Sequence, residues 1–203
     1  MKNIFNIDNK FFTFMSKAAD IMILNMLFIL TSLPIITIGT SLTALYSVSL
    51  KQSAGTSAYV AKEYFHAWKE NFRQSTILWV GSLSAFILLC LNLALKVDGT
   101  FYFFMRFMMF LSLVLYIMVT LYAFPLLAKF ENTLKHTIVN AFLMSIRHFF
   151  TTCTLFGTAA LFLFITVAYP SMIKLTSMAW FLFFFAIIAR IQATLLDKIF
   201  NRY

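Results

Sequence analysis

Few residues of this chain have the types and spacing that catalysis requires. The 203 residues include only 7 acidic residues, 3 histidines and 2 cysteines. His66, His136 and His148 fall on mixed polar stretches, where contact with water or lipid headgroups is expected more often than a catalytic role. Cys90 and Cys153 lie inside apolar runs, without the paired spacing of a zinc site or a redox motif. We therefore expect no enzyme activity, no metal site and no cofactor.

The stretch with the most functional potential is a break in a long apolar run. Residues 21–50 contain no charged side chain, and as one helix they would be roughly 45 Å long, against a hydrocarbon layer of about 30 Å. Pro34 and Gly39 supply a break. A helix that begins inside the bilayer has free backbone N–H groups, which can bind an anionic or hydroxyl-rich ligand. The candidate ligand-binding residues are Asn25, Thr37, Gly39, Thr40 and Ser41.

A purely structural role explains the same residues. The break is then the external turn of a helical hairpin, with Ser41 as the N-cap of the second helix. Gly39 then takes a backbone conformation that residues with a Cβ resist, and Asn25 joins helices by hydrogen bonds, as polar residues within spans often do. The sequence favours the external turn over a re-entrant ligand site and leaves both alternatives open.

Composition places the chain in a membrane. Hydrophobic residues make up 62% of the sequence and charged residues 11%, whereas soluble domains have about 45–50% and about 25%. The net charge of +9 comes from scattered Lys and Arg residues, as expected for segments that flank membrane spans rather than for a nucleic-acid surface. The expected partner is the lipid bilayer, and nucleic acid is not expected.

The apolar runs predict an all-α polytopic transmembrane helical bundle, a single domain over residues 1–203. About six membrane segments are expected, the first two of which form the hairpin that is broken at Pro34 to Gly39. The second of these is short, at about residues 41–51. Further spans are predicted over residues 74–95, 107–128, 148–173 and 175–196. Two amphipathic helices, over residues 58–72 and 131–147, are predicted to lie on the membrane surface.

The two surface helices contain the candidate residues for contact with lipid or with a partner protein. Trp68 and Phe142 occupy corresponding apolar positions, each one residue after an alanine. The candidate interfacial residues are Trp68, Asn71, Arg73, Phe142 and Arg147.

A weak internal repeat accompanies these helices. Residues 67–74 align with residues 141–148 at a separation of 74 residues. The alignment suggests two parallel units of span, surface helix and span, at about residues 36–95 and 107–169.

The distribution of basic residues predicts the topology. If residues 21–50 return to the side from which they entered, 13 of the 16 Lys and Arg residues lie on one side of the membrane. A single crossing would leave only a weak bias between the two sides. We therefore predict a multi-pass protein of the cell membrane with both termini in the cytoplasm.

Three stretches resemble the motifs of a known family. The first runs from Asn25 to Tyr46 and includes the break, the second from Phe65 to Gln74, and the third from Phe124 to Asn132. They resemble the YesL family of bacterial, mostly Gram-positive, membrane proteins, and the resemblance covers essentially the whole chain. It implies an integral membrane protein of unknown function that is often associated with carbohydrate-uptake genes, without catalytic residues to assign.

Two functions fit these observations. One is an accessory or regulatory component that contacts other membrane proteins of a sugar-uptake or sensing system. The alternative is a small solute transporter or channel that acts as a homo-oligomer. Transport usually needs a polar path through the membrane, and this chain has few charges away from the ends of its spans. The sequence therefore favours the accessory role.

Overall fold

The computed structural model describes residues 10–56, 59–94, 101–168 and 177–202. All regular secondary structure in these ranges is helical, which confirms the all-α fold class. The elements in order are α1 (Lys10–Ser32), the 3-10 turn η1 (Ile35–Thr37), α2 (Ile38–Ser53), α3 (Val60–Glu70), α4 (Phe72–Ala94), α5 (Phe101–Lys129), α6 (Leu134–Arg147), α7 (Phe149–Ala168), the π-helical segment η3 (Trp180–Phe184) and α9 (Phe185–Phe200).

Five helices are long and apolar enough to cross a membrane. They lie in α1, α4, α5, α7 and the last helix, which includes η3 and α9. In the most apolar stretch of each of these helices, only 11% to 28% of the residues are buried inside the protein. So much exposed apolar surface needs lipid around it, and the chain is therefore a multi-pass membrane protein. The ends predicted for the spans over residues 74–95 and 148–173 lie outside the described residues.

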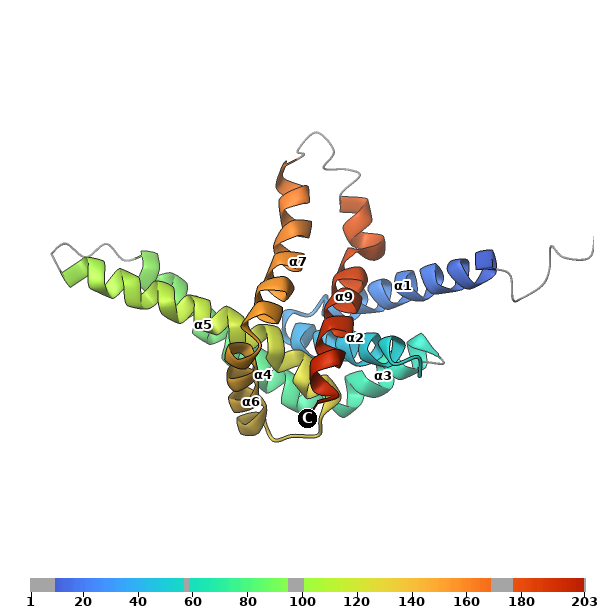
Figure 1. The fold of residues 1–203 in the computed structure, drawn as a ribbon, viewed down its shortest axis with the longest axis horizontal. Coiled ribbons are helices and arrows are strands. Elements are labelled where there is room, and N and C mark those ends of the chain that lie inside the picture. The colour runs from blue at the N-terminus through green and yellow to red at the C-terminus, as the bar shows by residue number, and fades with distance from the viewer. Residues whose placement is uncertain (1–9, 57–58, 95–100, 169–176, 203) are drawn as a thin grey trace, which may run out of the picture.

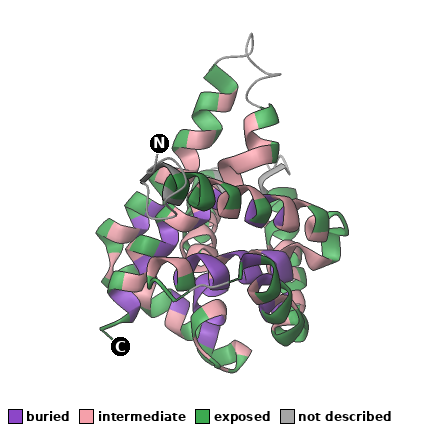
Figure 2. Cartoon of the chain, turned by 90° about the vertical axis from the view of Figure 1, so that its right-hand side faces the viewer, coloured by how far each residue is buried: buried purple, intermediate pink, exposed green. Residues whose placement is uncertain are grey.

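The long helices leave a common centre in different directions (Figure 1). Helix α1 and the α4–α5 pair extend to opposite sides, while α7 and α9 rise between them. Buried residues gather where the helices meet, and most residues in the outer half of α7 are exposed (Figure 2). The five apolar helices therefore do not share one axis. The cytoplasmic location of both termini stays a prediction.

The broken hairpin is present, but its second arm is unlike an ordinary span. Helix α1 ends at Ser32, Pro34 is extended (φ −74°, ψ 118°), and α2 packs back against α1. Helix α2 also contacts α3, α4, α5 and α9, and 10 of its 16 residues are buried. The short second arm is thus the central helix of the protein.

Gly39 allows α2 to lie directly against α4. A Cβ atom at Gly39 would be 2.4 Å from the Cβ of Trp79 and 2.7 Å from the carbonyl oxygen of Ser75. Gly39 lies inside a helix, and among the described residues only Gly55 has a positive φ. The conformational role that we expected for Gly39 is therefore wrong, because the glycine is needed for close packing.

The order of elements is the same in two parts of the chain, α2–α3–α4 and α5–α6–α7. The short helices α3 and α6 have Asn71 and His148 as their C-caps. Four residues later, Ser75 and Thr152 are both buried, and each hydroxyl is hydrogen-bonded to a hydroxyl on the first helix of its own group. Asn71 and His148 are 77 residues apart, and so are Ser75 and Thr152, whereas the alignment predicted from the sequence has a separation of 74 residues. The duplication stays a prediction, and a separation of 77 fits the helix ends better.

The packing at Gly39 leads to a testable prediction. Gly39→Ala should lower the free energy of unfolding by about 1–3 kcal/mol, because the added methyl group overpacks the contact between α2 and α4. Gly81→Ala is the matched control on α4, since a Cβ there meets nothing within 4 Å, and alanine favours the helix. Thermal unfolding of both variants in detergent tests this, and equal melting temperatures for the two would contradict it.

Candidate functional site

Asn25, the first of the predicted ligand-binding residues, holds two helices together. Its side chain is fully buried, and Nδ2 donates to the carbonyl oxygens of Trp180 (3.0 Å) and Phe181 (2.7 Å). Its Oδ1 accepts a hydrogen bond from the backbone N–H of Ala186 (2.9 Å). Trp180 and Phe181 belong to the π-helical segment, and Ala186 follows it. The regular α-helical hydrogen bonding is interrupted in this segment. Asn25 therefore supplies the partners that the interruption removes, and both of its N–H donors are engaged.

The hydroxyl groups at the break are also bonded within the protein. Thr37 Oγ1 lies 2.6 Å from the carbonyl oxygen of Thr31 and 2.8 Å from that of Pro34. Ser41 Oγ lies 2.9 Å from both the carbonyl oxygen of Thr37 and the hydroxyl of Thr31. Ser41 is inside α2, whose N-cap is Thr37, so its predicted capping role is wrong. The carbonyl group of Thr31, near the end of α1, is thus satisfied locally.

Two further contacts fix the break to its neighbours. Thr40 Oγ1 lies 3.1 Å from Thr76 Oγ1 on α4. The hydroxyl of Tyr64, on α3, lies 2.6 Å from Thr31 Oγ1. Burial raises the pKa of Tyr64 to about 12, so its phenol is neutral at physiological pH. This role could not be predicted from the sequence, because Tyr64 is one of several aromatic residues in the amphipathic helix predicted over residues 58–72.

The predicted interfacial residues have different surroundings. Trp68 is half-buried, and its ring packs against Phe72 with 5.0 Å between centroids. Phe142 is 40% exposed on α6, so it does not match Trp68 in burial. Asn71 caps α3 and donates to the carbonyl oxygen of Ala67 (3.1 Å). Arg73 and Arg147 are both exposed.

A polar cleft of about 550 Å³ opens where several helices end. Its lining includes side chains of both charges together with amides and hydroxyls, so it suits a polar surface without a large net charge. We call it the polar cleft. Its lining residues are Ser47 and Lys51 of α2, Glu70, Asn71 and Gln74 at the α3–α4 junction, and residues 127–133 at the end of α5 and in the following loop.

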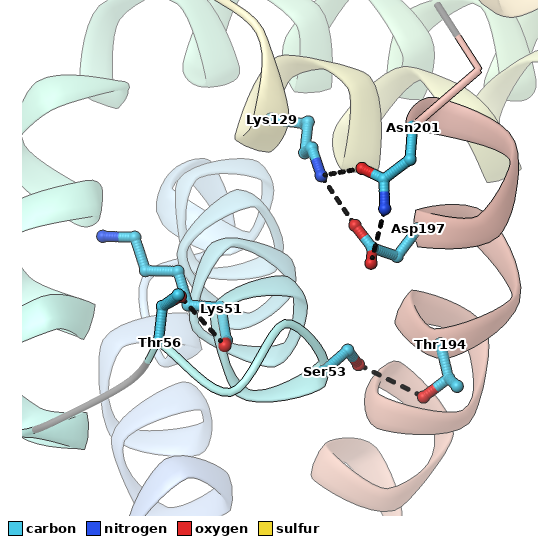
Figure 3. Close-up of polar contacts among 7 residues, drawn as sticks. All are labelled: Lys51, Ser53, Thr56, Lys129, Thr194, Asp197 and Asn201. Atoms are coloured by element: carbon cyan, nitrogen blue, oxygen red, sulfur yellow. Dashed lines mark hydrogen bonds and ion pairs between the residues drawn. The ribbon is translucent and has the colours of Figure 1, made fainter.

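Ion pairing fixes one wall of the polar cleft (Figure 3). Lys129 Nζ lies 2.6 Å from Asp197 Oδ1 and 3.2 Å from Asn201 Oδ1, which binds the end of α5 to α9. The hydroxyls of Ser53 and Thr194 lie 3.2 Å apart and bind the end of α2 to the same helix. These contacts hold the ends of α2 and α5 in place on either side of the cleft.

The polar cleft brings together stretches that are far apart in the sequence. The stretches from Phe65 to Gln74 and from Phe124 to Asn132 supply most of its lining, and Ser47 directly follows the stretch that ends at Tyr46. Asn71 is the only lining residue that we predicted as a candidate. The sequence did not reveal the cleft, because separate charged residues near helix ends look like ordinary flanking residues.

The bonds of Asn25 lead to a second prediction. Asn25→Leu should lower the free energy of unfolding by roughly 1–3 kcal/mol, because it leaves buried backbone groups of the last helix without partners. The matched control is Asn92→Leu, since Asn92 is exposed and donates within its own helix to Leu88. Thermal unfolding in detergent measures both, and an equally small effect of the two substitutions would show that Asn25 is not needed to join the helices.

Comparison with known proteins matches one part of the chain to a family model. No curated protein and no solved structure matches the chain. Residues 21–93, which run from α1 through most of α4 and include the broken hairpin, match the model of a family described as "Protein of unknown function, DUF624".

Proposed function

We propose that the protein is an accessory or regulatory component of the cell membrane, rather than an enzyme, and that it holds a partner protein at the polar cleft. The observation that carries this proposal is the contrast between the two polar regions. The hydroxyl groups at the break are hydrogen-bonded within the protein, whereas charged residues of both signs line an open space at the cleft.

The lining of the polar cleft suits a protein partner. Lys51, Glu70 and Glu131 are exposed and present charges of both signs, which orient a partner and select against wrong ones more than they add affinity. Asn71 and Asn132 add amide groups, which can donate and accept hydrogen bonds with a polar loop.

The resemblance to YesL-like proteins extends the proposal to the identity of the partner. We infer that the partner is a membrane protein of a carbohydrate-uptake or sensing system, and that both termini of the chain lie in the cytoplasm. On this topology the polar cleft faces the cytoplasm too, because Lys51 and Lys129 belong to the segments that the distribution of basic residues places there.

A small oligomeric transporter or channel is the second candidate function. One observation favours it: α2 carries buried hydroxyl residues along its length, at Thr40, Ser41, Thr43, Ser47 and Ser49. They would line a polar path only if α2 separated from α4 and α9, since several of them bond within α2 or to α4.

The partner proposal is tested with a substitution that preserves net charge. Lys51→Ala with Glu131→Ala removes one charge of each sign from the polar cleft, and should cut the recovery of cross-linked partner proteins several-fold at unchanged yield. The control, Lys17→Ala with Asp20→Ala on α1, removes the same two types of charge elsewhere. Cross-linking in cells, purification and mass spectrometry give the readout.

Two results would contradict the proposal. Recovery of the same partners with the cleft variant and the control would show that the cleft does not hold them. Uptake of a solute by lipid vesicles that contain only this protein would favour the transporter instead.

A further inference from the structure

We propose that a groove between α4 and α5 binds one acyl chain of a membrane lipid. The lining comes from one face of residues 77–85 of α4, from residues 116–124 of α5, and from Leu134 and Ile138 of α6. We call this space the acyl groove. It shares no lining residue with the polar cleft, so the inference does not depend on the partner proposed there.

Small side chains on α4 create the acyl groove. Gly81, Ser82 and Ala85 lie on its α4 side. A Cβ atom at Gly81 would meet nothing within 4 Å, so the space beside this glycine is open. Both helices are long and apolar enough to cross a membrane. An open apolar space within the bilayer forfeits dispersion contacts unless hydrocarbon fills it.

Aromatic contacts at its two ends hold the acyl groove open. The rings of Trp79 and Phe124 pack with 6.4 Å between centroids, and those of Phe86 and Tyr116 with 5.9 Å. The hydroxyl of Tyr116 also donates to the carbonyl oxygen of Ser82 (3.0 Å), which bonds α5 to α4. The separation of the two helices is thus fixed before a ligand enters, and a preformed site loses less free energy to ordering on binding.

The hydroxyl groups of the lining are already used within the protein. Ser82 Oγ donates to the carbonyl oxygen of Trp79 (2.9 Å). Thr120 Oγ1 lies 3.0 Å from the carbonyl oxygens of both Tyr116 and Ile117. Because these donors and that of Tyr116 are engaged, the lining has no hydroxyl hydrogen left for a polar ligand. The occupant that matches it is a hydrocarbon.

The acyl groove lies at the depth of a single leaflet. Residues 77–85 lie about 8–20 Å from the start of α4 at Phe72, and residues 116–124 lie equally far from the end of α5 at Lys129. Gln74 and Lys129 both line the polar cleft, so the two helix ends are at one level. The groove therefore runs for about 12 Å, within the roughly 15 Å that one leaflet contributes to the hydrocarbon layer.

The volume of the acyl groove favours a chain over a helix. It measures about 390 Å³, whereas a helix with side chains is about 10 Å across and needs roughly 900 Å³ over 12 Å of its length. An apolar cavity of about 150 Å³ already holds a benzene molecule. A single acyl chain therefore fits the groove, and a helix of a second copy or of another protein does not.

The test uses phosphatidylcholine with a photoactivatable diazirine on one acyl chain, in lipid nanodiscs that contain the full-length protein. Mass spectrometry measures labelling of residues 116–124, none of which is exposed, relative to Leu30 on α1, which is 61% exposed. Gly81→Leu fills the groove and should lower this ratio several-fold. Gly157→Leu on α7 is the matched control, since a Cβ there also meets nothing within 4 Å, and it should leave the ratio unchanged.

Two further measurements guard against misfolding of the Gly81 variant. Ala85→Leu fills the same groove one turn further along α4 and should lower the ratio as well. In the unmodified protein, residues 116–124 should be labelled at least as strongly as Leu30, although lipid that only surrounds the protein would label them weakly. Much weaker labelling than at Leu30, or equal ratios in Gly81→Leu and Gly157→Leu, would overturn the proposal. Weak labelling together with an oligomer that Gly81→Leu dissociates would instead assign the groove to a second copy of the chain.

Discussion

The burial of α2 is the constraint on which the rest of the structure depends. Its 16 residues span only about 24 Å at 1.5 Å per residue, less than the roughly 30 Å of a hydrocarbon layer. A helix this short and this rich in hydroxyl groups must therefore be covered by other helices. Thr43 and Ser49 bond back to the carbonyl oxygens of Gly39 (3.0 Å) and Leu45 (2.7 Å), which meets the polar requirement inside the helix itself. Small side chains then allow five other helices to approach.

The last helix is fixed by polar contacts at three levels along its length. At its first turns, Asn25 of α1 binds the π-helical segment. In its middle, Gln192 accepts a hydrogen bond from Tyr46 of α2 and donates to the carbonyl oxygen of Leu155 on α7 (3.0 Å). At its end, Asp197 pairs with Lys129 of α5. Each contact ties the helix to a different neighbour, and such contacts between apolar helices contribute roughly 0.6–2 kcal/mol each.

The sequence predicted the parts of the fold that depend on composition. Apolar runs predicted the five long helices that the structure describes, and Pro34 and Gly39 predicted the break in the hairpin of α1 and α2. The sequence did not predict what depends on three-dimensional contact. Gly39 was attributed to backbone conformation, although its neighbour Trp79 is 40 residues away and explains it. The polar cleft was missed for the same reason, since its walls come from four separate helices.

Many polar groups in the interior are hydrogen-bonded within the protein. The open polar space lies at the end of the molecule where α2 and α5 finish beside α9. The polar cleft and a second groove, of about 310 Å³ beside α6, both lie there, and Phe130 and Asn132 line both of them. These two residues belong to the short connection between α5 and α6, which is therefore a wall shared by the two spaces. A ligand that moves this wall in one space changes the other, and by linkage the effect on binding free energy must be equal in both directions. The shared wall is thus a physical means of coupling whatever occupies the two spaces.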